Sequence, residues 1–332
     1  MIPVYSSWLA AHGKLWYDDK GYRIAWIVWP QALAILAVLW FWAMPSSGRN
    51  AQWAKPVDPA TRTNQLLALR DSAKTSRSAM DTLERDARGG EAVAEFFYGT
   101  LFDPDFKLST IVQPDESKTL DWYGRAAAQG HESALNNLAV AYHRGVYVRA
   151  DYTRACFYAR KLSNNAFHGG LQVKGDCYAR GLGGTPVDMT QAANAYEVSA
   201  SKGNVRAEAA LGYFYENGLG GKDRNSEIAL KHYRSAADKG DALGLHNLGS
   251  AYNSGLLGLQ RDGSEAARLI MKALEAKYDV TVQSLTNHSE LWTADFWQNL
   301  QRRLEEKGLY SGVIDGRANS ATLDAVRRLG KA

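Results

Sequence analysis

A repeat of about 37 residues runs through the middle of this chain and restricts the folds that are open to it. Alanine recurs 37 residues apart at Ala155, Ala192, Ala229 and Ala266. Glycine recurs in steps of 36, 37 and 37 residues, three residues after a tyrosine each time, at Gly145, Gly181, Gly218 and Gly255. A fixed period of this length is typical of stacked supersecondary units. We therefore expect a solenoid from Glu91 to Asp279.

Each copy of the repeat consists of two short helical segments, and each segment is closed by a glycine. Neither segment could bury its apolar face alone, so neighbouring copies must stack to form a continuous core. Small residues such as Gly212 and Ala229 would let adjacent helices approach closely. The recurring glycines follow the last aromatic residue of a helix, where a left-handed cap is least costly for glycine.

These residues resemble the Sel-like branch of the tetratricopeptide repeats, whose pattern is Ala…Leu-Gly…Tyr…Gly followed by Ala…Tyr…Ala-Ala…Gly. Three copies in residues 168–279 fit well, and residues 131–167 fit with Ala139 at the position of the helix glycine. A degenerate first copy spans residues 91–130, where Thr119 replaces an alanine. The resemblance implies an all-α solenoid of five helix pairs and a protein-interaction scaffold. A structural array without an exposed binding face is the alternative.

Motifs for catalysis, cofactors and metals are missing from the sequence. The seven histidines form no His-Glu-x-x-His pair, and no Gly-x-Ser-x-Gly elbow occurs. The Gly-Leu-Gly-Gly segments at 181–184 and 218–221 recur with the repeat and are expected to be loops, because no strand precedes them. The net charge is +4 without a long Lys/Arg run, which argues against nucleic acid. We expect no enzyme activity, no cofactor and no metal.

Four polar side chains are candidates for contact with a protein partner. Asn136 and Asn137 occupy the same repeat positions as His246 and Asn247. Equivalent positions on the first helices could line one shared face of the solenoid. A solvated polar face explains the same residues equally well.

The two cysteines, Cys156 and Cys177, belong to adjacent helices of neighbouring copies. Two cysteines are too few for a zinc ribbon or a disulfide-dense scaffold. If this region lies outside the cytoplasm, the two could form a disulfide. Otherwise we expect two buried thiols.

An apolar segment near the N-terminus predicts a membrane anchor. Residues 24–44 contain no charge, and as a helix they would span about 31 Å, against a hydrocarbon core of about 30 Å. Tryptophans near both ends are typical of membrane interfaces. We expect a single uncleaved transmembrane helix after an N-terminal tail at 1–23, with a cleaved signal peptide as the alternative. Lys20 and Arg23 favour a cytoplasmic N-terminus and a periplasmic bulk of the chain.

Residues 45–90 are expected to form a linker followed by one helix between Thr61 and Arg88. Apolar and small residues follow alternating three- and four-residue steps at Leu66, Leu69, Ala73, Ser76, Met80, Leu83 and Ala87. Such a seam is typical of a coiled coil. The alternative is a helix that caps the first repeat.

Residues 291–332, after a linker at 280–290, resemble the small three-helix peptidoglycan-binding domain. The resemblance is carried by Leu300-Gln301, Leu304, Gly308, Gly312, Asp315-Gly316, Asn319, Thr322 and Ala325. Asn319 stands where the family has glycine, and asparagine is the next-best residue for a left-handed conformation. The resemblance implies glycan contact through Tyr310, Asp315, Arg317 and Asn319. Packing or protein contact is the alternative role, and Asp315 could simply organise a turn.

These features together predict a bacterial inner-membrane scaffold. One helix anchors the chain, the solenoid holds a partner protein in the cell envelope, and the terminal module contacts peptidoglycan. The alternatives are a subunit of a larger envelope complex for secretion, motility or polysaccharide export, and an activator of a wall hydrolase.

Overall fold

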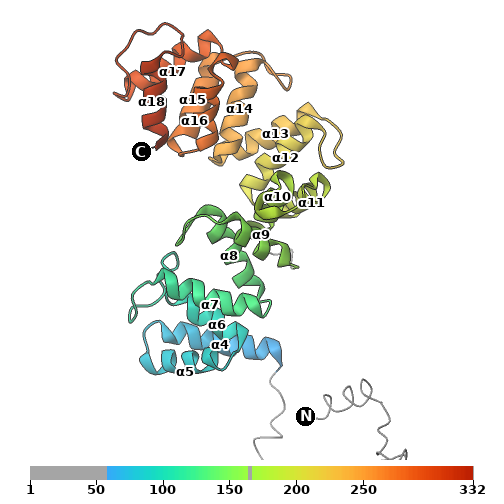
Figure 1. Cartoon of the computed structure of the whole chain (residues 1–332), viewed down its shortest axis with the longest axis vertical. Coiled ribbons are helices and arrows are strands. Elements are labelled where there is room, and N and C mark those ends of the chain that lie inside the picture. Colours follow the sequence, from blue (N-terminus) through green and yellow to red (C-terminus); the bar gives the residue numbers. More distant parts are fainter. Residues whose placement is uncertain (1–57, 164–166, 332) are drawn as a thin grey trace, which may run out of the picture. The chain divides into compact units, whose positions relative to one another are not determined.

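The structure is a computed structural model that describes residues 58–163 and 167–331. These residues form fifteen α-helices, α4 to α18, and two 3₁₀ turns, without a β-strand (Figure 1). The chain divides into two units between Arg62 and Thr63, and the helix pairs lie in the second unit, Thr63–Ala332. The expected tail and transmembrane helix, residues 1–44, lie outside the described residues. No helix within the described residues is both long and apolar enough to cross a membrane.

Five antiparallel helix pairs follow one another along the second unit (Figure 1). The pairs are α6 (Ala92–Thr100) with α7 (Glu116–Ala128), α8 (Glu132–Arg144) with α9 (Tyr152–Lys161), α10 (His168–Arg180) with α11 (Met189–Ser201), α12 (Val205–Asn217) with α13 (Ser226–Asp238), and α14 (Ala242–Ser254) with α15 (Gly263–Glu275). The 3₁₀ turn η1 (Leu182–Gly184) lies between α10 and α11. The expected all-α solenoid is confirmed.

Caps at both ends set the length of the helices. The first helices of copies two to five end at left-handed glycines, as the sequence predicts, with φ between 65° and 73° at Gly145, Gly181, Gly218 and Gly255. Each second helix begins at an acidic or amide residue whose side chain accepts a hydrogen bond from the third helical amide. These caps are Asp115, Asp151, Asp188, Asn225 and Asp262. The free amides at the start of each second helix need a hydrogen-bond acceptor. The capping residues therefore recur with the period of about 37 residues found in the sequence.

Helix approach within a pair depends on matching a small residue with a large one. A Cβ at Gly212 would lie 2.6 Å from two ring carbons of Tyr233, and a Cβ at Gly249 would lie 3.0 Å from Ile270. In copy two, Ala139 replaces the glycine, and the position equivalent to Tyr233 holds Ala159. Both alanines are fully buried. The departure of Ala139 from the repeat pattern therefore has a compensating change in the opposite helix.

The single helix expected between Thr61 and Arg88 is wrong, because the structure has two, α4 (Pro59–Ala73) and α5 (Arg77–Arg88). The Ser76 side chain caps α5 by accepting a hydrogen bond from the Ala79 amide. Most of the expected seam, Leu66, Ala73, Met80, Leu83 and Ala87, is buried with Phe97, Tyr98 and Trp122 of the first repeat. The apolar seam is thus used inside the unit, as a cap on the solenoid.

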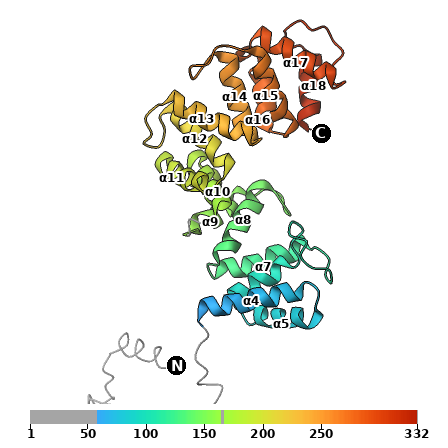
Figure 2. The same cartoon turned by 180° about the vertical axis from the view of Figure 1, so that it is seen from behind.

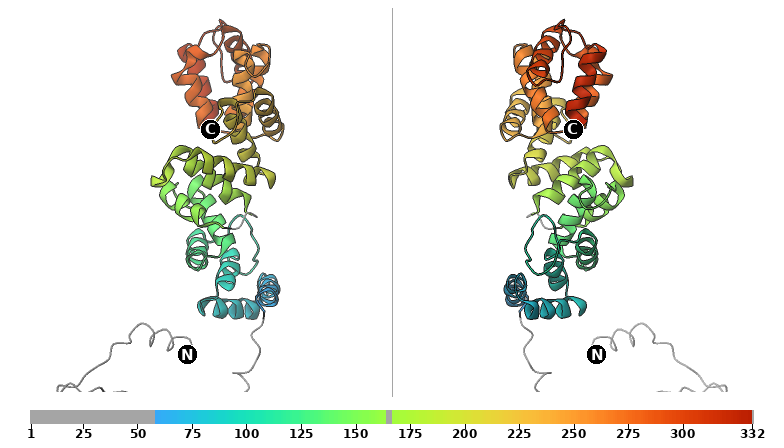
Figure 3. Two further views of the ribbon diagram at one scale, coloured as in Figure 1. Left: turned by 90° about the vertical axis from the view of Figure 1, so that its right-hand side faces the viewer. Right: turned by 90° about the vertical axis from the view of Figure 1, so that its left-hand side faces the viewer.

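The C-terminal segment continues the core of the last repeat. Its elements are α16 (Asp279–Asn287), the 3₁₀ turn η2 (Ser289–Leu291), α17 (Ala294–Glu306) and α18 (Ser320–Lys331). The expected linker at 280–290 is therefore mostly helical. Ile270 and Leu274 of α15 share one buried cluster with Phe296, Leu300 and Val326. Figures 2 and 3 show α17 and α18 beside α15 and α16.

Candidate functional site

A pocket of about 420 Å³ opens in the first three helix pairs. Its lining comes from the α6–α7 connection, from α7 and α8, from the loop after α8, from the start of α10 with the residue before it, and from the residue that precedes α12. The lining residues are Asp103, Asp105, Phe106, Leu120, Tyr123, Asn136, Asn137, Val140, Ala141, Arg144, Val146, Tyr147, Phe167, His168, Gly169 and Asn204. It combines apolar walls with amides, carboxylates and an arginine, which is the mixture found where proteins hold specific ligands.

The buried carboxylate of Asp103 organises the floor of the pocket. This residue is only 3% exposed. The Tyr123 hydroxyl donates to Oδ2 at 2.7 Å, and the Tyr147 hydroxyl donates to Oδ1 at 2.6 Å. The backbone amide of Asp105 also donates to Oδ1, at 2.9 Å. Burial, with the adjacent carboxylate, raises the pKa of both tyrosines, so their hydroxyls stay protonated and remain donors.

Tyr147 holds a costly backbone conformation at this pocket. Its φ is 67°, in the left-handed region that a residue with a bulky side chain rarely adopts. The hydrogen bond from its hydroxyl to Asp103 fixes the side chain across the pocket. Backbone strain of this kind is concentrated at functional sites.

Asn136 and Asn137 of α8 both line the pocket, as expected for two residues of a partner-binding face. Asn136 Oδ1 accepts a hydrogen bond from the Gly170 amide at 2.8 Å, and its Nδ2 donates to Asn137 Oδ1 at 3.0 Å. Asn136 therefore ties α10 to α8 and orients its neighbour. Asn137 lies next to Tyr123 on the pocket wall.

His246 and Asn247 occupy the equivalent positions of α14, yet they lie away from the pocket. His246 Nδ1 is 3.1 Å from Thr281 Oγ1 of α16, and its ring lies 6.2 Å from that of Trp292. Burial lowers the pKa of His246 to about 4. Asn247 Nδ2 is buried without a hydrogen-bond partner among the described residues. Helix α16 covers this end of the face, so the four expected partner-binding residues do not form one surface.

The expected glycan-binding residues lie in the loop between α17 and α18, and Gln301 holds that loop. Gln301 is fully buried; its Nε2 donates to Asp315 Oδ1, to the Arg317 carbonyl and to Thr322 Oγ1 at 2.9–3.0 Å. Its Oε1 accepts from the amides of Asp315 and Gly316. The Tyr310 hydroxyl donates to the Val313 carbonyl at 2.7 Å, and Asn319 Oδ1 accepts from the Thr322 amide.

These contacts engage the Tyr310 hydroxyl, Asp315 Oδ1 and Asn319 Oδ1 within the module itself. The Arg317 side chain is exposed. Asp315 organises the turn by accepting from the Arg317 amide, which is the structural alternative that the sequence left open.

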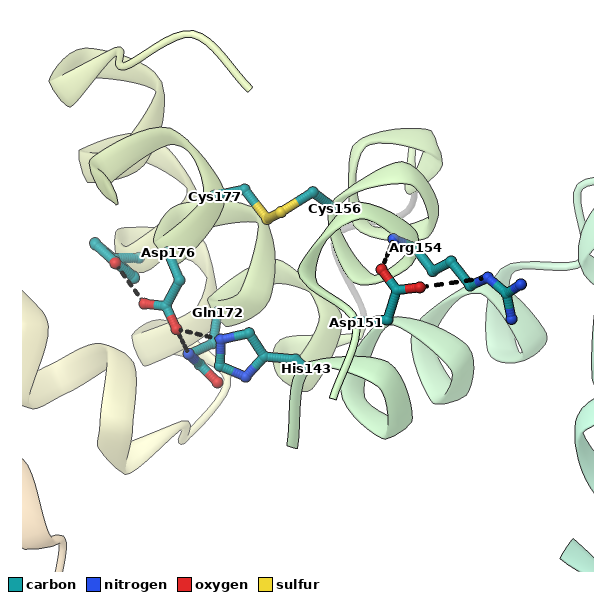
Figure 4. Close-up of a disulfide and its surroundings, with 8 residues drawn as sticks. His143, Asp151, Arg154, Cys156, Gln172, Asp176 and Cys177 are labelled. Atoms are coloured by element: carbon teal, nitrogen blue, oxygen red, sulfur yellow. Dashed lines mark hydrogen bonds and ion pairs between the residues drawn. A yellow bond between two sulfur atoms is a disulfide. The ribbon is translucent and has the colours of Figure 1, made fainter. Parts of the chain in front are cut away.

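Cys156 of α9 and Cys177 of α10 form a disulfide with a Cα–Cα distance of 5.8 Å (Figure 4). Both residues are fully buried. Of the two alternatives for these cysteines, the structure has the disulfide. A structural disulfide indicates an oxidising, extracytoplasmic compartment. Figure 4 also shows His143 beside Asp176. The distance between His143 Nε2 and Asp176 Oδ2 is 3.1 Å.

Metal binding has no candidate in the part of the chain that the structure describes, where no three His, Cys, Asp or Glu side chains come together as a metal ion requires. Sequence reasoning missed Asp103 and Tyr147 entirely. The available signal was the spacing between an acid and a tyrosine. Asp103 precedes Tyr123 by 20 residues, and Asp176 precedes Tyr196 by the same number. In the structure both pairs are hydrogen-bonded.

The model of the Sel1 repeat matches five segments of the chain, at 92–131, 132–166, 175–204, 205–241 and 242–278, which together make up more than half of its length. A crystal structure of a Sel1 repeat protein from Oxalobacter formigenes is similar, with 21% identity and a TM-score of 0.54, over 83% of this chain and 98% of that one. A protective antigen of uropathogenic Escherichia coli that displays an SLR fold has 22% identity and a TM-score of 0.36, over 76% and 63%. An immunity protein from Pseudomonas aeruginosa has 19% identity and a TM-score of 0.36, over 76% and 80%. The sequence has no match among curated proteins.

Proposed function

From the premise that this chain belongs to the Sel1 repeat family, we propose that it is a non-enzymatic scaffold that holds a partner polypeptide in the cell envelope. The observation that carries the proposal is the pocket around Asp103, Asn136 and Asn137. The Asn137 amide on its wall can pair with a peptide backbone, and the exposed apolar ring of Phe106 lines the same pocket. Stacked helix pairs present such surfaces without any bond being made or broken.

Two independent features support the proposed location of the scaffold. The disulfide supports an oxidising compartment for helices α9 and α10, because such bonds are rare in the cytoplasm. The uncharged run at 24–44 and the flanking Lys20 and Arg23 fit a single-pass anchor in a bacterial inner membrane with a cytoplasmic N-terminus. A compartment-sensitive reporter fused after Ala332 tests this arrangement. Reporter activity on the cytoplasmic side would refute it.

Partner binding is tested by filling the pocket. Asn137→Trp places a large ring on the pocket wall, while Tyr213→Trp changes a half-exposed residue of α12 that does not line the pocket. We expect the first variant, and not the second, to lose polypeptides that co-purify with the full-length protein from its native membranes. Circular dichroism must show the same helical content for both. If both variants co-purify with the same amount of these polypeptides, the pocket is not the binding site.

Glycan contact is the second element of the proposal, supported by the order of motif residues from Leu300 to Ala325. Because the module shares its core with α15, deleting it would uncover Ile270 and Leu274. A surface change is therefore the better probe. Arg317→Glu should reduce co-sedimentation of the full-length protein with purified peptidoglycan sacculi, whereas Arg302→Glu on α17 should not. If the wild-type protein does not sediment, the module serves as an end cap of the solenoid.

Two other roles are distinguished by simple observations. A subunit of a secretion, motility or polysaccharide machine would co-purify with a multi-subunit assembly through residues 24–44 alone. An activator of a wall hydrolase would raise the turnover of that separate enzyme.

A further inference from the structure

The carboxylate of Asp103 lies at the floor of the pocket without a cationic partner from the chain. Its hydrogen bonds come from two tyrosine hydroxyls and one backbone amide, which are neutral donors. Among the residues that the structure describes, no Lys, Arg or His nitrogen lies within ion-pair distance of it. A buried charge is costly unless it is paired or strongly hydrogen-bonded. The chain therefore leaves this buried carboxylate without a cation of its own among the described residues.

The hydrogen-bonding capacity of Asp103 is also incomplete. A carboxylate has about four acceptor positions. Oδ1 accepts from Tyr147 and from the Asp105 amide, and Oδ2 accepts from Tyr123 alone. One acceptor position remains on Oδ2.

A second acid, Asp176 of the third repeat, provides an internal comparison, because its partner Tyr196 occupies the repeat position of Tyr123. Asp176 accepts from the Tyr196 hydroxyl at 2.6 Å, as Asp103 accepts from Tyr123. Around Asp176, however, the Gln172 amide donates to Oδ2 and His143 Nε2 lies 3.1 Å from the same atom (Figure 4). The chain thus supplies one further donor, the Gln172 amide, and a neighbouring imidazole at Asp176, which does not line the pocket. At Asp103, which does line the pocket, the described residues supply no cationic nitrogen within ion-pair distance.

The surroundings of Asp103 suit a cation on a long apolar stem. The rings of Phe106, Tyr123 and Tyr147 line the pocket, and aromatic faces attract cations. The exposed carboxylate of Asp105 lies at the same pocket. Arg144 and His168 also line it, and they would repel a cation. Arg144 is exposed to solvent, whereas Asp103 is not, so solvent screens the arginine more strongly.

We propose that this pocket binds the ammonium of a lysine or the guanidinium of an arginine carried by an extended segment of the partner polypeptide. This inference rests on the proposed function, because it names the chemistry of the partner at the same site. The cation takes the open acceptor position of Asp103 Oδ2, and its methylene stem packs against Phe106.

The experiment titrates the full-length protein, labelled with ¹³C in its tyrosine rings, with blocked heptapeptides of the form Gly-Ser-Gly-X-Gly-Ser-Gly. X is lysine, arginine, norleucine or glutamate, and ionic strength is held constant. Tyr123 and Tyr147 signals, assigned with their Phe variants, report occupancy. We expect the lysine and arginine peptides to bind at least tenfold more tightly than the norleucine and glutamate peptides, with affinity that falls as salt is raised.

Matched variants locate the effect. Asp103→Asn should abolish the preference for the cationic peptides, while Asp176→Asn, which alters the same kind of tyrosine contact outside the pocket, should keep it. Because Asp103→Asn changes a buried group, Asp105→Asn provides a second variant at an exposed position. We expect it to weaken binding of the cationic peptides about twofold to fivefold, as for an exposed ion pair.

Three results would overturn the inference. If all four peptides bind with equal affinity, the pocket binds polypeptide without a preference for cationic side chains. The inference then fails, while the proposed function stands. Equal loss in the Asp103→Asn and Asp176→Asn variants would show that the effect is not local to the pocket. Binding of none of the peptides would overturn both the inference and the proposed function.

Discussion

Replacing Gly212 by alanine tests whether close packing between paired helices holds the solenoid together. The new Cβ would lie 2.6 Å from Cδ1 and Cε1 of Tyr233 and 3.3 Å from the Ala229 carbonyl oxygen. The Tyr233 ring is fully buried, and its hydroxyl donates to Glu216 Oε2 at 2.7 Å. The ring is therefore held at both ends and cannot move aside.

The expected magnitude follows from two opposing terms. Overpacking a tight core costs about 1–3 kcal/mol. Replacing glycine by alanine inside a helix returns about 1 kcal/mol. Gly212→Ala should therefore lower the free energy of unfolding by about 0–2 kcal/mol. Gly124→Ala is the matched control, because a Cβ on that helical glycine of α7 meets nothing within 4 Å, and it should raise the free energy by about 1 kcal/mol.

Urea denaturation followed by circular dichroism measures both variants, with midpoints compared at a constant slope. A double variant sharpens the test. Gly212→Ala together with Tyr233→Ala recreates the alanine pair that copy two holds at Ala139 and Ala159. In the Tyr233→Ala background the clash is absent, so Gly212→Ala should become stabilising. The reasoning is refuted if Gly212→Ala has the same effect in both backgrounds, or if it shifts stability as Gly124→Ala does.

The remaining predictions concern the disulfide, the C-terminal loop and the partly buried His246. Replacing Cys156 and Cys177 by alanine should lower the free energy of unfolding by about 3 kcal/mol in urea denaturation, because the disulfide joins residues that are 21 apart in the sequence. Dithiothreitol should lower the stability of the wild type by the same amount and leave that of the variant unchanged. Gln301→Leu should cost about 2–3 kcal/mol by leaving the buried partners of the amide unsatisfied, and limited proteolysis should then cleave residues 309–319; an uncut loop would contradict this role. His246 has a folded-state pKa lowered to about 4 from 6.5, so the unfolded state binds more protons between these values and stability falls as pH falls through this window. His246→Gln should remove about 2–3 kcal/mol of the loss between pH 7 and pH 4, and equal losses in variant and wild type would disprove the assignment.

Much of the fold follows from local rules that recur in each copy. A 37-residue period, glycine at the end of the first helix and a small residue opposite a large one are all visible in the sequence, and the helix pairs are confirmed. The break between α4 and α5 was not visible, because the seam from Leu66 to Ala87 keeps its spacing across the turn at residues 74–76. Periodicity reports which residues are buried, and it does not distinguish one straight helix from two packed ones.

The candidate site was only partly predictable, because half of it comes from departures from the repeat. Asn136 and Asn137 follow the repeat and were identified. Asp103 lies in the α6–α7 connection, which is longer than the corresponding connection in the other copies, so the repeat does not assign it a position. Its 20-residue spacing from Tyr123 was the one signal in the sequence. His246 was misplaced for a similar reason, since α16 covers it and residues 280–290 carry few apolar residues that would predict a helix.

The most direct test of partner binding is site-specific photocrosslinking in living cells. Benzoylphenylalanine replaces Phe106 in the pocket or Tyr213 of α12 outside it, two aromatic residues that are each 50% exposed. The account predicts a discrete polypeptide adduct from position 106 that disappears in the Asp103→Asn variant, with no such adduct from position 213. Absence of an adduct at position 106, or the same adduct from both positions, would contradict it.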